Sequence, residues 1–152
     1  MKGTITQIIG PVVDVRFDPN PSDGQARLPA IKNALHVEHK GKTLTLEVAQ
    51  HLGLNRARCI AMQDTSGLAR DTDVTDTGAP ISVPVGEAAL GRMFNVVGEP
   101  IDGIAAPKSP KRNPIHAEAP VFTQQSTKAE VFETGIKAVD LLCPFVKGGK
   151  VG

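Results

Sequence analysis

Apolar and polar side chains alternate with a period of two through much of the first 85 residues, as they do in half-buried β-strands. The clearest runs are residues 13–17 and 43–48, in which every second side chain is valine, leucine or phenylalanine. Short apolar runs predict further strands at Lys2–Ile9, Ala57–Gln63 and Ile81–Val85. The N-terminal part of the chain is therefore predicted to be mainly β.

The best hairpin candidate is residues 34–49, in which His39–Lys42 interrupts two apolar runs and Gly41 supplies the turn. Glycine, proline and aspartate separate the other predicted strands at Gly10-Pro11, Asp18–Gly24, Asp64–Gly67 and Gly78–Pro80. Five or six short strands without a helical period predict a small closed antiparallel barrel, here six-stranded. Closure is expected because an open sheet of this size leaves two unpaired edges.

The pattern changes after Gly86. A short apolar run at Met93–Val97 leads into a turn at Gly98–Gly103. Residues 104–120 contain four prolines, which predict an extended connector without a regular helix or a β-ladder.

The last part of the chain predicts one helix and one strand. Thr134 is a candidate N-cap for a helix over Gly135–Leu142, whose apolar residues share one face, and Pro144 ends it. Phe145 and Val146 then begin a strand, and no residues downstream are expected to pair with it.

Composition narrows the class of protein. Lys and Arg total 17 against 16 Asp and Glu, and there is no Trp or Tyr, which argues against a nucleic-acid or membrane-surface binder. Cys59 and Cys143 are far apart and suggest neither a disulfide framework nor a CxxC site. No signal-peptide core or run of ~20 apolar residues is present, so we expect a soluble protein from a reducing compartment.

The segment Gly86–Met93 has the glycine spacing of a phosphate-binding loop, but its last two positions are Arg92 and Met93. That loop needs a lysine for the phosphates and a hydroxyl for magnesium, so we interpret the segment as a glycine-rich turn. The ending at Gly149-Lys150 fails for the same reason, because Val151 occupies the hydroxyl position.

The acidic residues do not match a calcium loop. A loop starting at Asp71 places Asp76 where glycine is needed and Ser82 where the bidentate glutamate belongs. An exposed acidic loop containing Asp71, Asp73 and Asp76 is the better interpretation.

The remaining candidates also have structural interpretations. His36 and His39 are expected on opposite faces of a strand, and His51 and His116 are isolated. Cys59 is expected to pack in a strand and Cys143 at a helix end. The basic cluster of Lys108, Lys111 and Arg112 is interpreted as solvated linker. We therefore assign no catalytic, cofactor-binding or metal-binding residue.

Several stretches together resemble the N-terminal part of the beta subunits of F-type ATP synthases, over essentially the whole chain. They are Ile9–Val15, His51–Gly53, Asp76–Ile81, Val83–Gly86, Leu90–Arg92, Asn95–Asp102, Pro114–His116, Glu133–Lys137 and Asp140–Leu142. The Asn95–Asp102 stretch and the ending Lys147–Gly152 resemble the catalytic beta chain more than its alpha sibling. Departures at Asp71–Asp73 and His116–Pro120 leave the branch of the family open.

The resemblance implies a six-stranded barrel at residues 1–82, a connector at 83–120 and the first helix and strand of a RecA-like nucleotide-binding domain at 121–152. It implies a peripheral, membrane-associated complex at the cytoplasmic face of an energy-transducing membrane. There, alternating alpha and beta subunits surround a central stalk and couple ATP synthesis or hydrolysis to proton translocation. MgATP or MgADP is the expected ligand of the whole subunit.

In this family the phosphate-binding loop follows shortly after the position at which this chain ends, at Gly152. We therefore expect the 152 residues by themselves to hold no cofactor and to have no ATPase activity. Their expected contribution is assembly of the ring.

Three alternatives stay open: a free-standing barrel that binds an oligonucleotide or another ligand, a beta-like subunit of a related rotary or secretion ATPase, and an inactive natural or engineered fragment.

Overall fold

The computed structural model describes residues 1–19, 27–108, 111–125 and 128–152. The chain divides into two units, Met1–Ala117 and Glu118–Gly152, which we describe separately. Most of the turn predicted at Asp18–Gly24 lies outside the described residues.

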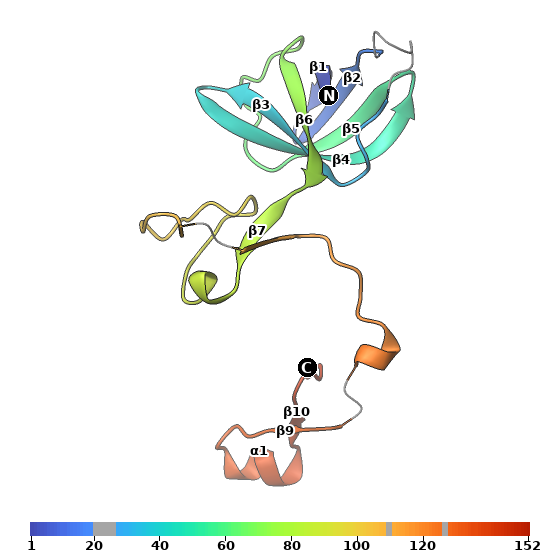
Figure 1. Cartoon of the computed structure of the whole chain (residues 1–152). Helices are drawn as coiled ribbons and strands as arrows, with labels where there is room; N and C mark the ends of the chain where they lie inside the picture. The colour runs from blue at the N-terminus through green and yellow to red at the C-terminus, as the bar shows by residue number, and fades with distance from the viewer. Residues whose placement is uncertain (20–26, 109–110, 126–127) are drawn as a thin grey trace. The chain divides into compact units, whose positions relative to one another are not determined.

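The first unit is built on a closed antiparallel barrel with the strand order β1-β2-β5-β4-β3-β6 (Figure 1). Its strands are β1 (Lys2–Ile9), β2 (Val12–Phe17), β3 (Asn33–His39), β4 (Lys42–Gly53), β5 (Arg56–Ala61) and β6 (Asp73–Pro80). The predicted fold class, a mainly β chain with a six-stranded barrel, is confirmed.

The predicted β3–β4 hairpin is also confirmed, with His39 paired to Lys42 across a two-residue turn. The turn residues Lys40 and Gly41 have φ of 51° and 71°. Two successive positive φ values are the mark of a type I′ turn, whose twist matches that of the flanking strands. The turn therefore determines the register of this side of the barrel.

The strand predicted at Ile81–Val85 is present as β7 (Ser82–Val85), but it lies outside the barrel. The strand that closes the barrel is β6, in the region interpreted as an acidic loop and a turn. Strand β6 pairs with β1 on one side and with β3 on the other. Only Val74 of this strand is buried, so the alternation that identifies the other strands is missing from its sequence.

The inward-facing side chains of all six strands form one apolar core. Its buried members are Ile5, Val13, Val15, Phe17, Leu35, Val37, Leu44, Leu46, Val48, Ala57, Cys59 and Val74. Cys59 packs in a strand as predicted, and burial raises the pKa of its thiol to about 12, with a smaller contribution from the charge of Asp14. This thiol is therefore a core side chain that stays protonated at neutral pH.

Gly3 makes room for the largest side chain of the core. It pairs with Phe17 across β1 and β2. A Cβ atom at position 3 would lie 2.9 Å from the Phe17 ring and 2.8 Å from the Arg16 carbonyl oxygen. The absence of a side chain at Gly3 thus allows the ring to pack against the backbone of β1.

A two-stranded sheet follows the barrel and corrects the prediction of a connector without a ladder. Strand β7 (Ser82–Val85) pairs antiparallel with β8 (Lys111–Pro114), and the 3-10 turn η1 (Glu87–Ala89) follows β7. Prolines are tolerated here because a two-stranded sheet consists only of edge strands, where a missing N–H need not break the ladder.

The second unit contains η2 (Phe122–Gln124), β9 (Val131–Phe132), the helix α1 (Lys137–Leu142) and β10 (Phe145–Val146). The predicted strand at Phe145 does have a partner, because β10 pairs antiparallel with the upstream β9. This small antiparallel pair and helix indicate a RecA-like domain only weakly.

The predicted helix begins later than expected, at Lys137, and Thr134 does not cap it. Instead the Asp140 carboxylate accepts hydrogen bonds from the backbone N–H and hydroxyl of Thr134 and from the N–H of Gly135. These bonds, led by the hydroxyl of Thr134, lower the pKa of Asp140.

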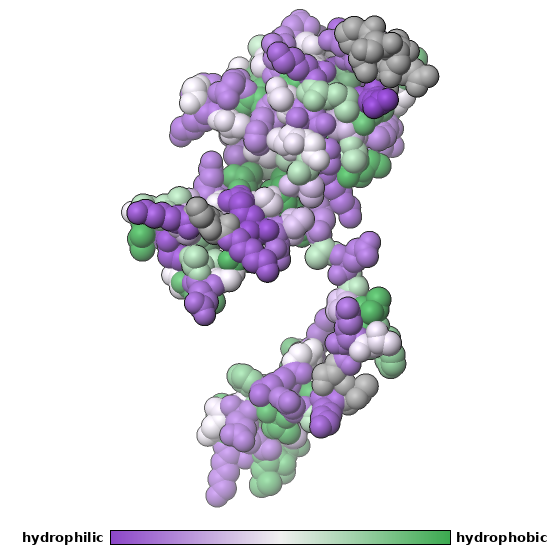
Figure 2. All heavy atoms as spheres, viewed as in Figure 1, coloured by the Kyte–Doolittle hydropathy of each residue, from purple (hydrophilic) through white to green (hydrophobic). Residues whose placement is uncertain are grey.

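None of the described residues of the second unit is buried, and apolar side chains lie at its surface (Figure 2). Cys143 is exposed, so the expectation that it packs at the helix end is wrong. No helix in the described part of the chain has the length and apolar character needed to cross a bilayer.

We expect Gly3→Ala to destabilise the barrel by about 1–3 kcal/mol, as overpacked cores do. Chemical denaturation of Gly3→Ala, Phe17→Leu and the double variant measures the coupling between the two positions. The smaller side chain of Phe17→Leu should recover part of the loss. Independent, additive effects would contradict the proposed contact.

We also expect Val121–Gly152 to exchange its amide hydrogens faster than Ile5–Val85, because so few of its backbone bonds are covered by apolar contacts. Hydrogen exchange followed by mass spectrometry of peptides from the intact chain tests this. Equal protection in both regions would contradict the described division of the chain.

Candidate functional site

The outer wall of the barrel carries a paired carboxylate and guanidinium. Asp14 and Arg58 are directly opposite each other on β2 and β5. The Nε and Nη2 groups of Arg58 donate to the two carboxylate oxygens of Asp14 at 2.8 and 2.9 Å. Asp14 is only 4% exposed although it points outward, because the arginine lies over it.

This ion pair affects the pKa of Asp14. The hydrogen bond from Arg58 lowers it, burial opposes the shift, and the charge of Arg56 adds to it. The backbone carbonyl of Asp14 also accepts a hydrogen bond from the Thr6 hydroxyl on β1. Asp14 therefore links three neighbouring strands, β1, β2 and β5.

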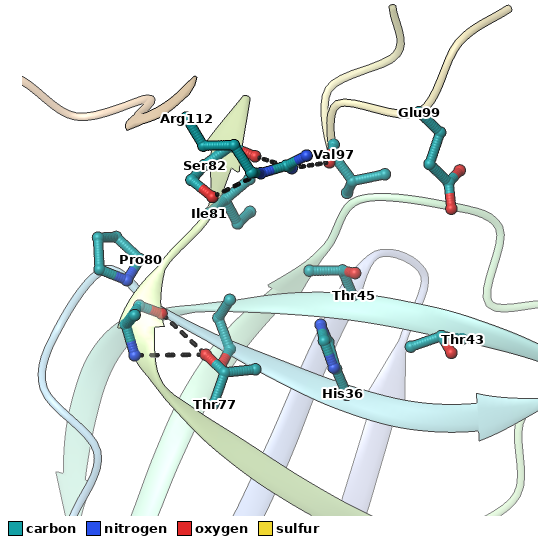
Figure 3. A pocket seen from close by; sticks show the side chains of 12 residues that line it. His36, Thr43, Thr45, Thr77, Pro80, Ile81, Ser82, Val97, Glu99 and Arg112 are labelled. Atoms are coloured by element: carbon teal, nitrogen blue, oxygen red, sulfur yellow. Dashed lines mark hydrogen bonds between the residues drawn. The ribbon is translucent and has the colours of Figure 1, made fainter. Parts of the chain in front are cut away.

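The segment after β6 folds back on the outside of β3 and β4. Ile81 is buried there, and a hollow of about 400 Å³ lies between the segment and the barrel wall. The lining includes His36, Thr45, Glu99 and Arg112 (Figure 3). This hollow is a polar concavity where the barrel meets the residues that follow it. A larger hollow of about 710 Å³ is lined by residues of the β3–β4 hairpin together with Gln63, Asp64 and Glu99.

Arg112 is a structural tie, which corrects its interpretation as solvated linker. Its guanidinium donates to the backbone carbonyl of Ser82 at 2.5 Å, to the Ser82 hydroxyl at 3.2 Å and to the carbonyl of Val97 at 3.3 Å (Figure 3). A Cβ at Gly98 would lie 2.9 Å from the same guanidinium. Arg112 thus joins β7, β8 and the turn at residues 95–99.

A second arginine closes the loop between β7 and β8. The Nε and Nη2 groups of Arg92 donate to the Asp102 carboxylate at 2.5 and 3.1 Å. The guanidinium also bonds to the carbonyls of Ile104 and Ala105 and lies 5.7 Å from the Phe94 ring centre. The hydrogen bond from Arg92 holds the pKa of Asp102 well below its usual range.

The Arg92–Asp102 pair was not predicted from the sequence. There, the chemistry of Arg92 was considered only at the position where a phosphate-binding loop needs a lysine. The interpretation of Gly86–Met93 as a turn agrees with the 3-10 turn found there. An available signal was the turn at Asn95, whose side chain accepts bonds from the N–H groups of Val97 and Glu99. Such a turn reverses the chain, so that Arg92 before it and Asp102 after it lie close together.

Three of the four histidines bond to separate acceptors. His39 lies 3.1 Å from the carbonyl of Ser66, His51 lies 2.8 Å from that of Pro29, and His116 lies 2.7 Å from the Glu47 carboxylate. The fourth, His36, is exposed beside the hollow.

In the described part of the chain, no group of three His, Cys, Asp or Glu residues is arranged to hold a metal ion. Of the acidic residues considered for calcium, Asp73 and Asp76 belong to β6 rather than to a loop. The Asp76 carboxylate accepts from the Asn33 side chain and from the N–H of Gly78. Asp76 therefore helps to join β3 and β6.

These contacts share one function, which is to tie separate backbone segments to each other. Arg58, Arg92 and Arg112 each make several hydrogen bonds to acceptors of their own unit, and His116 attaches the end of the segment to β4. A guanidinium that makes two parallel bonds fixes geometry more firmly than a single contact. The arrangement holds the wall of the barrel and the segment after it together, and it leaves the outward-facing side chains available for contacts with other molecules.

We expect Asp14→Asn to destabilise the chain by about 1–3 kcal/mol at neutral pH, since the bond to a charged partner is lost. The folded pKa of Asp14 is lowered, so its contribution is complete above the unfolded value near 4 and is lost as pH falls through the folded value. The two proteins should therefore converge in stability in acid.

Urea unfolding from pH 7 down to pH ~2 measures this convergence. Asp18→Asn, which changes an exposed carboxylate just after β2, is the matched control and should have little effect. A difference between Asp14→Asn and the parent chain that does not change with pH would contradict the assignment.

Comparison with known families identifies the barrel. Residues 5–78 match the family model described as "ATP synthase alpha/beta family, beta-barrel domain". The matched range begins in β1 and ends in β6, so it covers the strands that close the barrel. Residues 5–78 therefore form a β-barrel domain of the ATP synthase alpha/beta family.

Proposed function

We propose that this chain supplies the ring-forming barrel of a catalytic, beta-type subunit of an F-type ATP synthase. The observation that carries the proposal is the agreement between the matched residues 5–78 and the closed barrel. The choice of beta rather than alpha is supported by the resemblance of Asn95–Asp102 and Lys147–Gly152 to the catalytic chain. In the structure, the first of these stretches forms the turn closed by Arg92.

The architecture suits a part that transmits force between subunits. Every strand of the barrel is hydrogen-bonded on both sides, so deformation must break ladder bonds rather than move a free edge. The tie between Arg58 and Asp14 adds a charged contact across β2 and β5. A ring of such barrels resists the strain that a rotating central stalk imposes.

The barrel wall also has an apolar row available for a neighbour. Ile9, Val12 and Ile60 are successive partners across β1, β2 and β5, so their side chains share the outer face. Ile9 is 58% exposed and Ile60 is 43% exposed. Apolar side chains grouped on an outer sheet face favour a protein contact.

We further propose that the neighbours are alpha-type subunits and that the assembled complex binds MgATP or MgADP and couples its turnover to proton translocation. The family resemblance supports this proposal. It also supports a position at the cytoplasmic face of an energy-transducing membrane, which the chain reaches only as part of the whole complex. The barrel itself contributes assembly rather than phosphoryl transfer.

The test is binding of the full 152-residue chain to the alpha-type subunit of the same ATPase, measured by co-purification and by titration calorimetry. We expect Ile60→Asp to weaken binding about tenfold or more, because a charge in an apolar contact costs at least ~1.4 kcal/mol. Leu54→Asp is the control, since it places the same charge on an 85% exposed side chain in the β4–β5 turn.

Equal loss in both variants would indicate a general charge effect rather than a contact at Ile60. Failure of the unchanged chain to bind the alpha-type subunit would overturn the proposed function.

A further inference from the structure

The hollow of about 400 Å³ beside the barrel contains a nearly buried hydroxyl group to which the fold gives no partner. Thr45 of β4 lines this hollow and is only 6% exposed. Its backbone N–H donates to the Gln63 side chain and its carbonyl accepts from the N–H of Met62, but its hydroxyl makes no hydrogen bond to any described residue. Among these residues, no unpartnered side-chain nitrogen or oxygen is sealed from solvent. The Thr45 hydroxyl therefore opens toward the hollow (Figure 3).

A second polar group lies next to Thr45 on the barrel wall. His36 of β3 is the cross-strand partner of Thr45, so the two side chains share the outer face. His36 is exposed, and its imidazole makes no hydrogen bond within the described part of the chain, unlike the other three histidines. A neutral imidazole donates one hydrogen bond and accepts another. This wall of the hollow therefore offers unused donors and acceptors to a ligand.

The turn at residues 95–99 contributes a carboxylate to the same hollow. Glu99 lines the hollow and extends from the turn toward the barrel wall (Figure 3). Its Oε2 accepts a hydrogen bond from the Asn95 side chain at 2.8 Å, and its backbone N–H donates to that side chain at 2.9 Å. These two bonds orient the carboxylate, whereas Oε1 makes no hydrogen bond to the described residues. Glu99 is thus a positioned acceptor for a cationic group.

Arg112 supplies the opposite charge. Its Nε and Nη2 groups are held by Ser82 and by the carbonyl of Val97. The third guanidinium nitrogen, Nη1, makes no hydrogen bond in the part of the chain that the structure describes. Guanidinium groups bind carboxylates well because their N–H groups form a planar fork. One guanidinium and one carboxylate, each oriented by its neighbours, therefore line the same hollow (Figure 3).

Most of the remaining lining is apolar and small. Its apolar residues are Ala34, Ala79, Pro80, Ile81 and Val97. An apolar lining with a few fixed polar groups is typical of small-molecule sites, and the volume of this hollow falls in their range. The charges of Arg112 and Glu99 cancel, so an ion of either sign is attracted by one group and repelled by the other.

We propose that this hollow binds a free α-amino acid with a small apolar side chain. Arg112 binds the carboxylate of the ligand and Glu99 binds its ammonium group, while Thr45 and His36 add hydrogen bonds to these two groups. The apolar lining accommodates the side chain of the ligand. A zwitterion pairs with both charges of the lining at once, which a simple anion or cation does not.

This site is separate from the contact proposed for the alpha-type subunit. That contact involves Ile9, Val12 and Ile60 on β1, β2 and β5, none of which lines the hollow beside β3 and β4. Binding of an amino acid and binding of the subunit can therefore succeed or fail independently.

The experiment is an NMR titration of the full ¹⁵N-labelled chain with three matched ligands at equal ionic strength. L-valine carries both charges, isovalerate lacks the ammonium group and isobutylamine lacks the carboxylate. We expect L-valine to cause saturable shifts of the amide signals around Thr45 and Glu99. Each of the other two ligands should bind about tenfold more weakly or worse, because a hydrogen bond between charged groups is lost.

Two variants test the assigned contacts. Glu99→Gln should weaken binding of L-valine about tenfold, because the amide keeps the bond to Asn95 but loses the charge. Thr45→Val, which has nearly the same shape, should weaken it about threefold without lowering thermal stability, since the lost hydroxyl has no protein partner. Thr4→Val, the same change on β1 and away from the hollow, is the control and should leave binding unchanged.

Shifts that do not saturate, or that are spread over the whole barrel, would overturn the proposal. Equal binding of isovalerate and L-valine would do the same, because the hollow would then select an anion. Unchanged affinity in both Glu99→Gln and Thr45→Val would also contradict it. Tighter binding of an uncharged polyol such as erythritol would instead assign the hollow to hydroxyl-rich ligands.

Discussion

Closure of the barrel by β6 is the constraint on which the other features depend. This strand completes the ladder between β1 and β3 while contributing only Val74 to the fully buried core. Its contribution comes from backbone hydrogen bonds and from polar links such as that between Asp76 and Asn33. With β6 in place, every strand is paired on both sides, and the inward side chains form one closed core.

A closed barrel also determines where the following residues run. Strand β6 ends at Pro80, next to β3, so Ile81 enters a buried position outside β3 and β4. From there Arg112 and Arg92 organise the loop between β7 and β8, and His116 ties its end to Glu47. The polar residues of this region thus serve mainly to hold backbone segments in place, as suits a rigid part of a larger assembly.

On the outer wall of the barrel, some charged side chains lie beside a residue of the same charge. Asp14 and Arg58 neutralise each other, whereas no ion pair among the described residues includes Arg16 and Arg56 on one side or Glu38 and Asp73 on the other. A monomer gains nothing from such an arrangement, because each pair repels itself.

The sequence by itself determined the strands whose side chains alternate, the β3–β4 hairpin and the buried environment of Cys59, because a period of two places one set of residues in a core. It did not reveal β6, whose stability comes from ladder bonds to two distant strands rather than from its own pattern. It likewise missed the Arg92–Asp102 and Arg112 ties and the strand β8, since proline content argued against a ladder that the two edge strands tolerate. Only the tertiary structure places these like charges side by side. Arg16 and Arg56, and likewise Glu38 and Asp73, are far apart along the chain, and the register of the closed barrel makes them neighbours.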